Sequence, residues 1–438
     1  VHTRVTRYGY ELCGFWSTAD ESGRFFGLTG HWNDDFWTDP SVKTIYADWS
    51  PYSYWLEIDT RNGNGVTSFG YIDFDEMPEP LTGFWDDLLK NPGHDLVGIF
   101  SRAEGGTKYF DGEGKPTRVW DGGEDVNDNQ PRLYAQWKAS KYKVSFNANG
   151  GSGGQSAQVT ATYGSAMPAI STTKPTRTGY TFGGWYDTSA ASGGTQYYTA
   201  AGASACAWNK TGNATLYARW TPNSYTVEYW NKAGTTKLSS DSGFKYDTSR
   251  ALAAKPTSGV SAGHTAVGWA ESANQTASKY GFGSSQKNLA ASGTKRLYLA
   301  EIANRYTVSF DAKGGTGGQS ADVTATFGSL MPTIDTQKPT RTGYRFLGWY
   351  ENQSADGGQQ YYDASCKPVR NWDHASSWIL RAKWEGLTYT VSFAEAAGPG
   401  VQQSDVTVTY GSPMPDISSA KPVLAGYTFG GWYDTPSR

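Results

Sequence analysis

One short motif occurs six times along this chain, and its spacing constrains the fold more than any other feature. The clear copies are GYTFGGWY at 179–186, GYRFLGWY at 343–350 and GYTFGGWY at 426–433. The worn copies are at 9–16, 93–100 and 263–270. Successive copies begin 80 to 86 residues apart. A fixed period of this length indicates one folding unit used repeatedly. We therefore expect the function to depend on the array of repeats more than on any single residue.

The stretch 141–221 shows one complete unit. It opens with Tyr142–Phe146, where apolar and polar residues alternate with the period of a half-buried strand. A Gly-rich turn and a second strand over 158–163 complete a hairpin. The motif predicts a third strand, and Leu216–Trp220 predicts the last one.

The same pattern divides the whole chain into six segments. We expect a partial repeat (the C-terminal half) at 1–50, a divergent repeat with an inserted helix at 52–138, repeats at 141–221, 223–303 and 305–386, and a partial repeat (the N-terminal part) at 388–438. Both ends fall inside a unit, and half a repeat leaves strand edges uncovered. We therefore expect the chain to be a piece of a longer protein.

Helix is expected in few places. The insertion Thr82–Lys90 has a Thr at the N-cap position, acidic residues early and Lys late, which predicts a short helix. Elsewhere we expect at most a single turn near Met167 or Met331.

Composition excludes several classes of function. Lys and Arg number 38 against 41 Asp and Glu, so no basic face for nucleic acid is expected. No apolar run approaches the ~20 residues of a membrane span, and no signal peptide opens the chain, so we expect signal and anchor to lie outside this segment. Cys13, Cys206 and Cys366 fall at non-equivalent points of their repeats, which favours unpaired thiols.

The motif's aromatic residues admit two interpretations, a sugar-binding platform or a core. Aromatics make up 15% of the chain, and the unit 141–221 holds about the same share, which favours core and inter-repeat packing. The residues expected to be structural are Gly179, Tyr180, Phe182, Trp185, Trp220, Gly343, Tyr344, Phe346, Trp349 and Trp384. Strand alternation then points Tyr186, Tyr217 and Tyr350 outward, where they are candidates to contact a neighbouring repeat or a ligand.

The region 1–138 departs from the repeat pattern and holds the other candidate sites. Trp32 and Trp37 are candidate ligand-binding residues there. An acidic loop offers oxygens for calcium, although it lacks EF-hand spacing and a solvated loop is the simpler interpretation; its candidate ligands are Asp121, Glu124, Asp125 and Asp128. No HExxH, GxSxG or repeated carboxylate pair occurs, which argues against an enzyme and implies no cofactor.

These motifs resemble the Listeria–Bacteroides repeat, also called the internalin B-repeat, which occurs in tandem on bacterial surface proteins. The resemblance is carried by YTVSFD at 306–311, PTRTGY at 339–344, the Gly-Trp-Tyr of the motif and LYARW at 216–220. It implies a β-rich α+β fold in which small β-grasp (ubiquitin-like) repeats of about 80 residues follow one another as beads on a string. It also implies an exported location, and it carries no shared catalytic residues.

Two functional hypotheses follow. The first is a non-enzymatic extracellular segment, at the cell surface or secreted, that acts as a stalk, a spacer or a fibre-forming adhesin. Its partners would be neighbouring repeats, copies of itself in a filament, surface glycans or host proteins, with weak contacts summed by multivalency. The alternative is a glycan- or host-protein-binding module centred on 1–138.

Overall fold

The computed structural model describes residues 5–22, 25–27, 44–123, 130–352, 358–394, 403–417, 419 and 421–434. Strands account for 44% of the fold and helix for 1%, and the only helix in these ranges is α1 (Phe84–Leu88). The chain divides into two compact units, Val1–Pro222 and Asn223–Arg438, and each is described separately below.

Two repeats of the first unit share one sheet topology. In 141–221 the strands lie in the order β10-β9-β13-β11-β12, and the central pair β9 and β13 runs parallel while the other pairs are antiparallel. These strands are β9 (Lys141–Asn147), β10 (Val159–Thr162), β11 (Tyr180–Tyr186), β12 (Gln196–Thr199) and β13 (Ala214–Pro222). The repeat 52–138 has the equivalent order β5-β4-β8-β6-β7, with β4 (Ser53–Asp59), β5 (Val66–Asp73), β6 (His94–Phe100), β7 (Lys108–Phe110) and β8 (Arg132–Ala139).

The second unit repeats this topology. The repeat 305–386 has the order β21-β20-β24-β22-β23, formed by β20 (Arg305–Asp311), β21 (Val323–Thr326), β22 (Tyr344–Tyr350), β23 (Gln360–Tyr362) and β24 (Trp378–Gly386). The repeat 223–303 has a four-stranded sheet, β15-β14-β19-β17, and a separate β16–β18 pair. Its strands are β14 (Ser224–Trp230), β15 (Lys237–Lys245), β16 (Arg250–Ala251), β17 (His264–Ala270), β18 (Ser285–Gln286) and β19 (Gly293–Ala303).

The two end segments hold smaller sheets. The N-terminal one pairs in the order β2-β1-β3, with β1 (Tyr10–Trp16), β2 (Phe25–Gly27) and β3 (Tyr46–Pro51). The C-terminal one is a hairpin of β25 (Thr388–Val391) and β26 (Val406–Thr409). The sixth motif copy, 426–433, forms no strand, because within 403–434 the structure has no closing strand for it to pair with.

The expectation of an α+β, β-grasp fold is wrong: the repeats are nearly all β. A β-grasp domain packs a helix against its sheet, whereas the chain between β10 and β11 runs as turns and extended segments. Pro168 and Pro175 fall in this stretch, and proline is excluded from a helix interior because it lacks an N–H and clashes with the preceding turn. Met167 and Met331 are buried in non-helical chain, so no helical turn forms at either.

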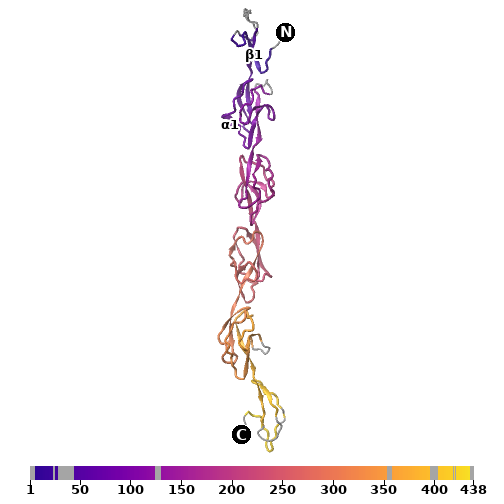
Figure 1. The fold of residues 1–438 in the computed structure, drawn as a ribbon, viewed down its shortest axis with the longest axis vertical. Helices are drawn as coiled ribbons and strands as arrows, with labels where there is room; N and C mark the ends of the chain where they lie inside the picture. Colours follow the sequence, from indigo (N-terminus) through magenta and orange to yellow (C-terminus); the bar gives the residue numbers. More distant parts are fainter. Residues whose placement is uncertain are drawn as a thin grey trace. The chain divides into compact units, whose positions relative to one another are not determined.

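The inserted helix α1 lies within the stretch predicted for it, beside the strands of the 52–138 repeat (Figure 1). Its N-cap is Gly83 and not Thr82. The Asp86 carboxylate accepts a hydrogen bond from the Gly83 N–H at 3.1 Å, so an acidic side chain from the first turn satisfies a free backbone donor.

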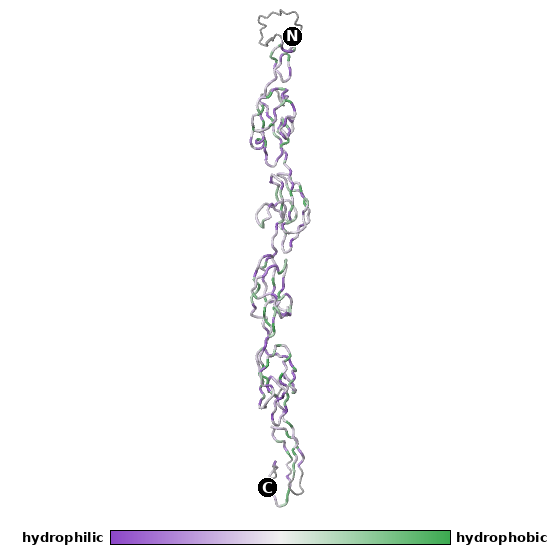
Figure 2. The backbone as a smooth tube through the Cα atoms, turned by 60° about the vertical axis from the view of Figure 1, so that its left-hand side comes forward, coloured by the Kyte–Doolittle hydropathy of each residue, from purple (hydrophilic) through white to green (hydrophobic). Residues whose placement is uncertain are grey.

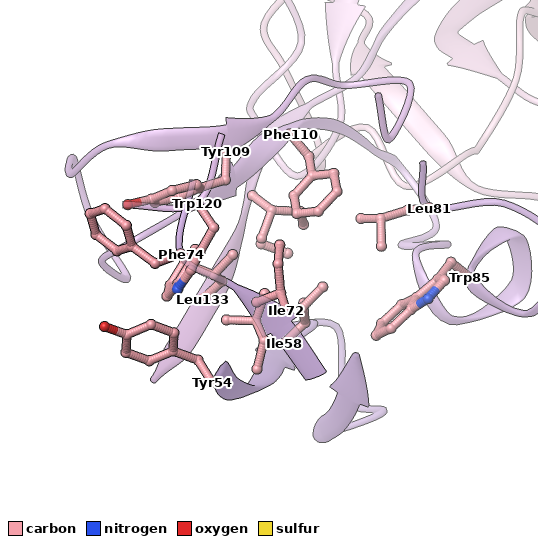
Figure 3. Close-up of a cluster of buried hydrophobic side chains, with 13 residues drawn as sticks. Tyr54, Ile58, Ile72, Phe74, Leu81, Trp85, Tyr109, Phe110, Trp120 and Leu133 are labelled. Carbon is pink, nitrogen blue, oxygen red and sulfur yellow. The ribbon is translucent and has the colours of Figure 1, made fainter. Parts of the chain in front are cut away.

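Each of these four repeats buries its own hydrophobic cluster. In 52–138 the cluster joins Tyr54, Ile58 and Leu133 from the central strands to Phe110 and Trp120 (Figure 3). Burying a large apolar side chain stabilises a fold by about 1.5–3 kcal/mol, so several such residues sustain a domain that has no disulfide. The three cysteines are free, as expected.

A β-bulge interrupts every motif copy that forms a strand. The pairing register shifts between Phe182 and Gly184, and it shifts at the equivalent place in β1, β6, β17 and β22. The extra residue brings Phe182 and Trp185 together, with ring centroids 5.5 Å apart. In β22 the rings of Phe346 and Trp349 are 5.6 Å apart. Two aromatic residues three positions apart therefore enter one core.

In the described ranges, no helix has the length and apolar character needed to cross a membrane. Hydrophobic residues occur in short stretches between hydrophilic ones along the chain (Figure 2).

Candidate functional site

The outward-facing tyrosines of the motif are covered by basic side chains. Tyr186 and Tyr217 are register partners across β11 and β13, and both are half-buried. The Arg219 guanidinium carbon lies 3.8 Å from the centroid of the Tyr186 ring, a cation–π contact. A ligand that stacked on this face would have to displace the guanidinium.

Tyr350 has an equivalent environment in the second unit. The Lys383 Nζ lies 5.1 Å from the ring centroid, and burial raises the pKa of the Tyr350 hydroxyl. The two repeats thus present the same arrangement, an aromatic ring beneath a cation. Ligand binding by Tyr186, Tyr217 and Tyr350 stays a prediction.

The tryptophans of the motif and of the closing strand face the cores. Trp185 and Trp349 are almost fully buried. The indole Nε1–H of Trp220 donates to the Ala148 carbonyl oxygen at 2.9 Å, and that of Trp384 to the Ala312 carbonyl oxygen at 3.0 Å. Phe182 and Phe346 complete the same clusters. Most aromatic residues of the motif therefore contribute to core packing.

The tyrosine that follows the motif's first glycine lies under an arginine. The Arg177 guanidinium carbon is 3.9 Å from the Tyr180 ring centroid, and that of Arg341 is 4.0 Å from Tyr344. Both tyrosines are half-buried. Gly179 and Gly343 have φ values of 78° and 79°, a left-handed backbone that glycine adopts readily.

The acidic loop can be judged at one residue only, because Glu124, Asp125 and Asp128 lie outside the described residues, as do Trp32 and Trp37. The Asp121 carboxylate is already engaged, since it accepts hydrogen bonds from the Tyr109 hydroxyl and the Arg118 guanidinium. In the part of the chain that the structure describes, no three His, Cys, Asp or Glu side chains are grouped to hold a metal ion.

The structure brings together an aromatic pair that the sequence interpretation missed. Trp55 and Tyr71 are register partners on β4 and β5, with ring centroids 4.9 Å apart and Tyr71 73% exposed. The equivalent pairs in the complete repeats are polar: Lys143 with Thr160, and Thr307 with Thr324. Aligning the opening strands position by position would have shown this substitution of aromatic for polar residues.

A second unpredicted cluster lies in the repeat 305–386. The rings of His374 and Trp378 stack in parallel, 4.8 Å apart and 2° from coplanar. His374 Nε2 is 3.2 Å from a Glu351 carboxylate oxygen, and the Trp378 indole N–H donates to the Glu351 carbonyl oxygen. Trp378 remains 42% exposed.

The repeated sheets, each with its own aromatic core, define a tandem-repeat protein built from small, nearly all-β domains. The family model for the Listeria–Bacteroides repeat domain matches four stretches of the sequence: 142–219, 225–293, 306–371 and 389–438. The chain belongs to this family.

Three relatives extend the comparison. A protein of Evansella cellulosilytica, whose name describes it as a Gly-rich membrane protein, is 29% identical over 98% of this chain and 44% of its own length. A second protein of that organism, named as a membrane protein, is 32% identical over 50% of this chain and 29% of its own length. Internalin H of Listeria monocytogenes is 32% identical over 35% of this chain and 25% of its own length. The chain thus spans less than half the length of each of these relatives.

Proposed function

We propose that this chain is a non-enzymatic, extracellular spacer segment of a bacterial cell-surface protein, which holds another part of that protein away from the surface. Its similarity to internalin H and to proteins named as membrane proteins supports the location. Membership of a tandem-repeat family supports a role in which the number of copies matters more than the identity of any one of them.

The observation that carries this proposal is the burial of the motif's aromatic residues in the core of each complete repeat. In each complete repeat the recurrent aromatic residues lie in a core, as Trp185, Trp269 and Trp349 do, each 2% exposed or less. What recurs is therefore mainly the packing of a core, whereas the Trp55–Tyr71 pair occurs in one repeat and is replaced by polar pairs in two others. A repeated core can extend the length of the array without requiring a shared chemistry on its surface.

A display experiment tests the spacer role. The 438-residue chain is placed between a cell-wall anchor and a reporter domain, and versions lacking one or two complete repeats are compared with it. Reporter height above the cell wall, measured by super-resolution imaging, should fall in equal steps whichever repeat is removed. A height that does not change, or that depends on one particular repeat, contradicts the proposal.

A second candidate function is recognition of a glycan or host protein by the divergent region, and the Trp55–Tyr71 pair favours it. Exposed aromatic rings are well suited to stack on sugar faces or to anchor a protein contact. The sister repeats place polar pairs at this position, so the change is specific to 52–138. The predicted contributions of Trp32 and Trp37 belong to the same hypothesis.

Binding of the whole chain to a glycan array, compared with Trp55→Ala and Tyr71→Ala variants, tests this second candidate. Lys143→Ala and Thr160→Ala serve as matched controls at the equivalent sheet position. Binding lost in the aromatic variants alone, with the fold intact, supports a recognition module. Equal binding by all four variants contradicts it. Assembly of copies into a fibre stays a separate prediction, which analytical ultracentrifugation checks.

A further inference from the structure

At four places the first glycine of the motif lies against an aromatic ring of the repeat that follows it. In the first unit the pairs are Gly9 with Phe74 and Gly93 with Tyr163; in the second unit they are Gly263 with Phe327 and Gly343 with Tyr410. Each of these glycines has a φ between 70° and 79°, and a methyl group added to any of them would overlap the ring. The aromatic residue is always the one directly after the second strand of its repeat.

The residue after each glycine adds an edge-to-face ring contact. His94 and Tyr163 have ring centroids 5.4 Å apart at 70°. The same geometry recurs three times: Tyr10 with Phe74 at 5.5 Å, His264 with Phe327 at 5.5 Å, and Tyr344 with Tyr410 at 5.4 Å. Edge-to-face pairs of this kind are favourable because a positive ring edge meets a negative ring face.

A single linker residue is held from both sides at each of these places. Ser140 separates β8 from β9; its N–H donates to the Gly93 carbonyl oxygen at 2.8 Å, and its carbonyl oxygen accepts from the Tyr163 N–H at 3.0 Å. Tyr52, Asn304 and Leu387 make the corresponding bonds, all between 2.8 and 3.0 Å. Because both backbone groups are paired, rotation about the linker breaks hydrogen bonds.

The backbone directly after the aromatic residue is in turn hydrogen-bonded to the core of its own repeat. The Gly164 N–H, next to Tyr163, donates to the Trp208 carbonyl oxygen at 2.8 Å. The Gly328 N–H, next to Phe327, donates to the Trp372 carbonyl oxygen at 2.7 Å. Trp208 and Trp372 are fully buried. The contact between repeats therefore reaches from a glycine in one sheet to a core tryptophan of the next.

We propose that this glycine–ring contact, together with its linker residue, is a dedicated docking surface whose partner is the following repeat. We call it the junction. Each junction couples two repeats into one mechanical and folding unit, so array stiffness is set by side-chain packing as well as by linker length. The proposal is independent of the spacer role, because the repeats would be coupled equally in a binding protein.

The junction also accounts for the first residue of the motif. Only glycine combines a positive φ with the absence of a Cβ, which lets the ring pack directly on the backbone. The turn before the motif strand also favours glycine, because Gly426 has a φ of 83° with nothing within 4 Å of an added methyl group. The turn therefore sets the backbone conformation, and the missing Cβ additionally makes room for the ring of the following repeat.

Hydrogen–deuterium exchange of the full chain, resolved to single residues, tests the proposal at Gly93. In Gly93→Ala the added methyl group displaces the Tyr163 ring and opens the two hydrogen bonds of Ser140. We expect the Ser140 and Tyr163 amides to exchange roughly tenfold faster or more. The Val144 and Ala161 amides, inside the same following repeat, should keep their protection.

Gly105→Ala is the matched control, because Gly105 lies in the same repeat with a φ of 67° and nothing within 4 Å of an added methyl group. A second variant removes the ring: Tyr163→Ala should also accelerate the Ser140 amide, whereas Tyr163→Phe should not. Equal acceleration in Gly93→Ala and Gly105→Ala overturns the proposal. So does unchanged exchange of Ser140 in both Gly93→Ala and Tyr163→Ala.

Discussion

At the scale of single residues, Glu301 is the most informative departure from the repeat pattern. It lies on β19 where the sister repeats carry Trp220 and Trp384, and it is fully buried. One carboxylate oxygen accepts from the Ser261 N–H at 3.1 Å, and the other has no hydrogen-bond partner in the structure. A buried polar atom without a partner costs stability. In this repeat that atom is a carboxylate oxygen, whereas the sister repeats leave nitrogens such as Trp208 Nε1 and Trp372 Nε1 without a partner.

Glu301→Gln should therefore stabilise the repeat 223–303. Glutamine keeps an acceptor for the Ser261 N–H, and burying a neutral amide costs less than burying a carboxylate, so the local free energy of unfolding should rise by about 1 kcal/mol. Exchange protection of the Leu297 and Leu299 amides measures the change. Glu385→Gln, at an exposed glutamate on β24, is the control and should shift protection little. A fall in protection in Glu301→Gln contradicts the expectation.

Glu271 provides a pH-dependent contribution to stability in the same repeat. Hydrogen bonds from Lys279, Lys295 and the Tyr280 hydroxyl lower its pKa from 4.5 to about 2. The carboxylate is favoured in the folded state, so its contribution is complete above pH 4.5 and is lost as the pH falls toward 2. The difference in melting temperature between the wild type and Glu271→Gln should shrink over that range. A constant difference from pH 6 to pH 2 would show that the shift is absent. Glu79→Gln, at an exposed site, is the control.

At the scale of elements, the alternation of apolar and polar residues did not reveal the β-bulge in β11. Simple alternation puts Trp185 inside, and it is inside, but alternation also separates it from Phe182 by face. The bulge at Gly184 cancels that separation and gives the core a second aromatic residue. A pattern with a fixed period of two cannot reveal an inserted residue, since only the pairing with β13 defines it.

Gly184→Ala should destabilise β11, whereas the neighbouring Gly183→Ala should not. Gly184 has a φ of 122°, and an added Cβ would overlap the Tyr198 carbonyl oxygen. The cost should reach about 2–3 kcal/mol, read from exchange of the Trp185 and Ala218 amides. Gly183 faces an ordinary contact with Arg219, and the equivalent position in β22 already carries Leu347. Similar effects of the two substitutions would argue against the bulge as the constraint.

At the scale of the whole molecule, coupled repeats should share their stability with their neighbours. Trp269→Ala removes a core indole of 223–303 and should destabilise that repeat by about 3–5 kcal/mol. If the Gly263–Phe327 junction couples the repeats, protection should also fall in the hairpin of β20 and β21. Adding Phe327→Ala should confine the effect of Trp269→Ala to its own repeat. Coupling would be contradicted if Trp269→Ala alone lowered protection only within the repeat 223–303.

The sequence by itself determined the period and four of the five strands in the repeat 141–221, and it missed β12. Those features are local, because they follow from alternation, from turn residues and from the repetition of one pattern. The tertiary structure decided the rest: extended chain where a β-grasp helix was expected, the bulge that adds Phe182 to the core, and the packing of the next repeat's ring against a turn glycine. These depend on contacts between residues distant in sequence, such as Gly93 and Tyr163, which no local pattern records.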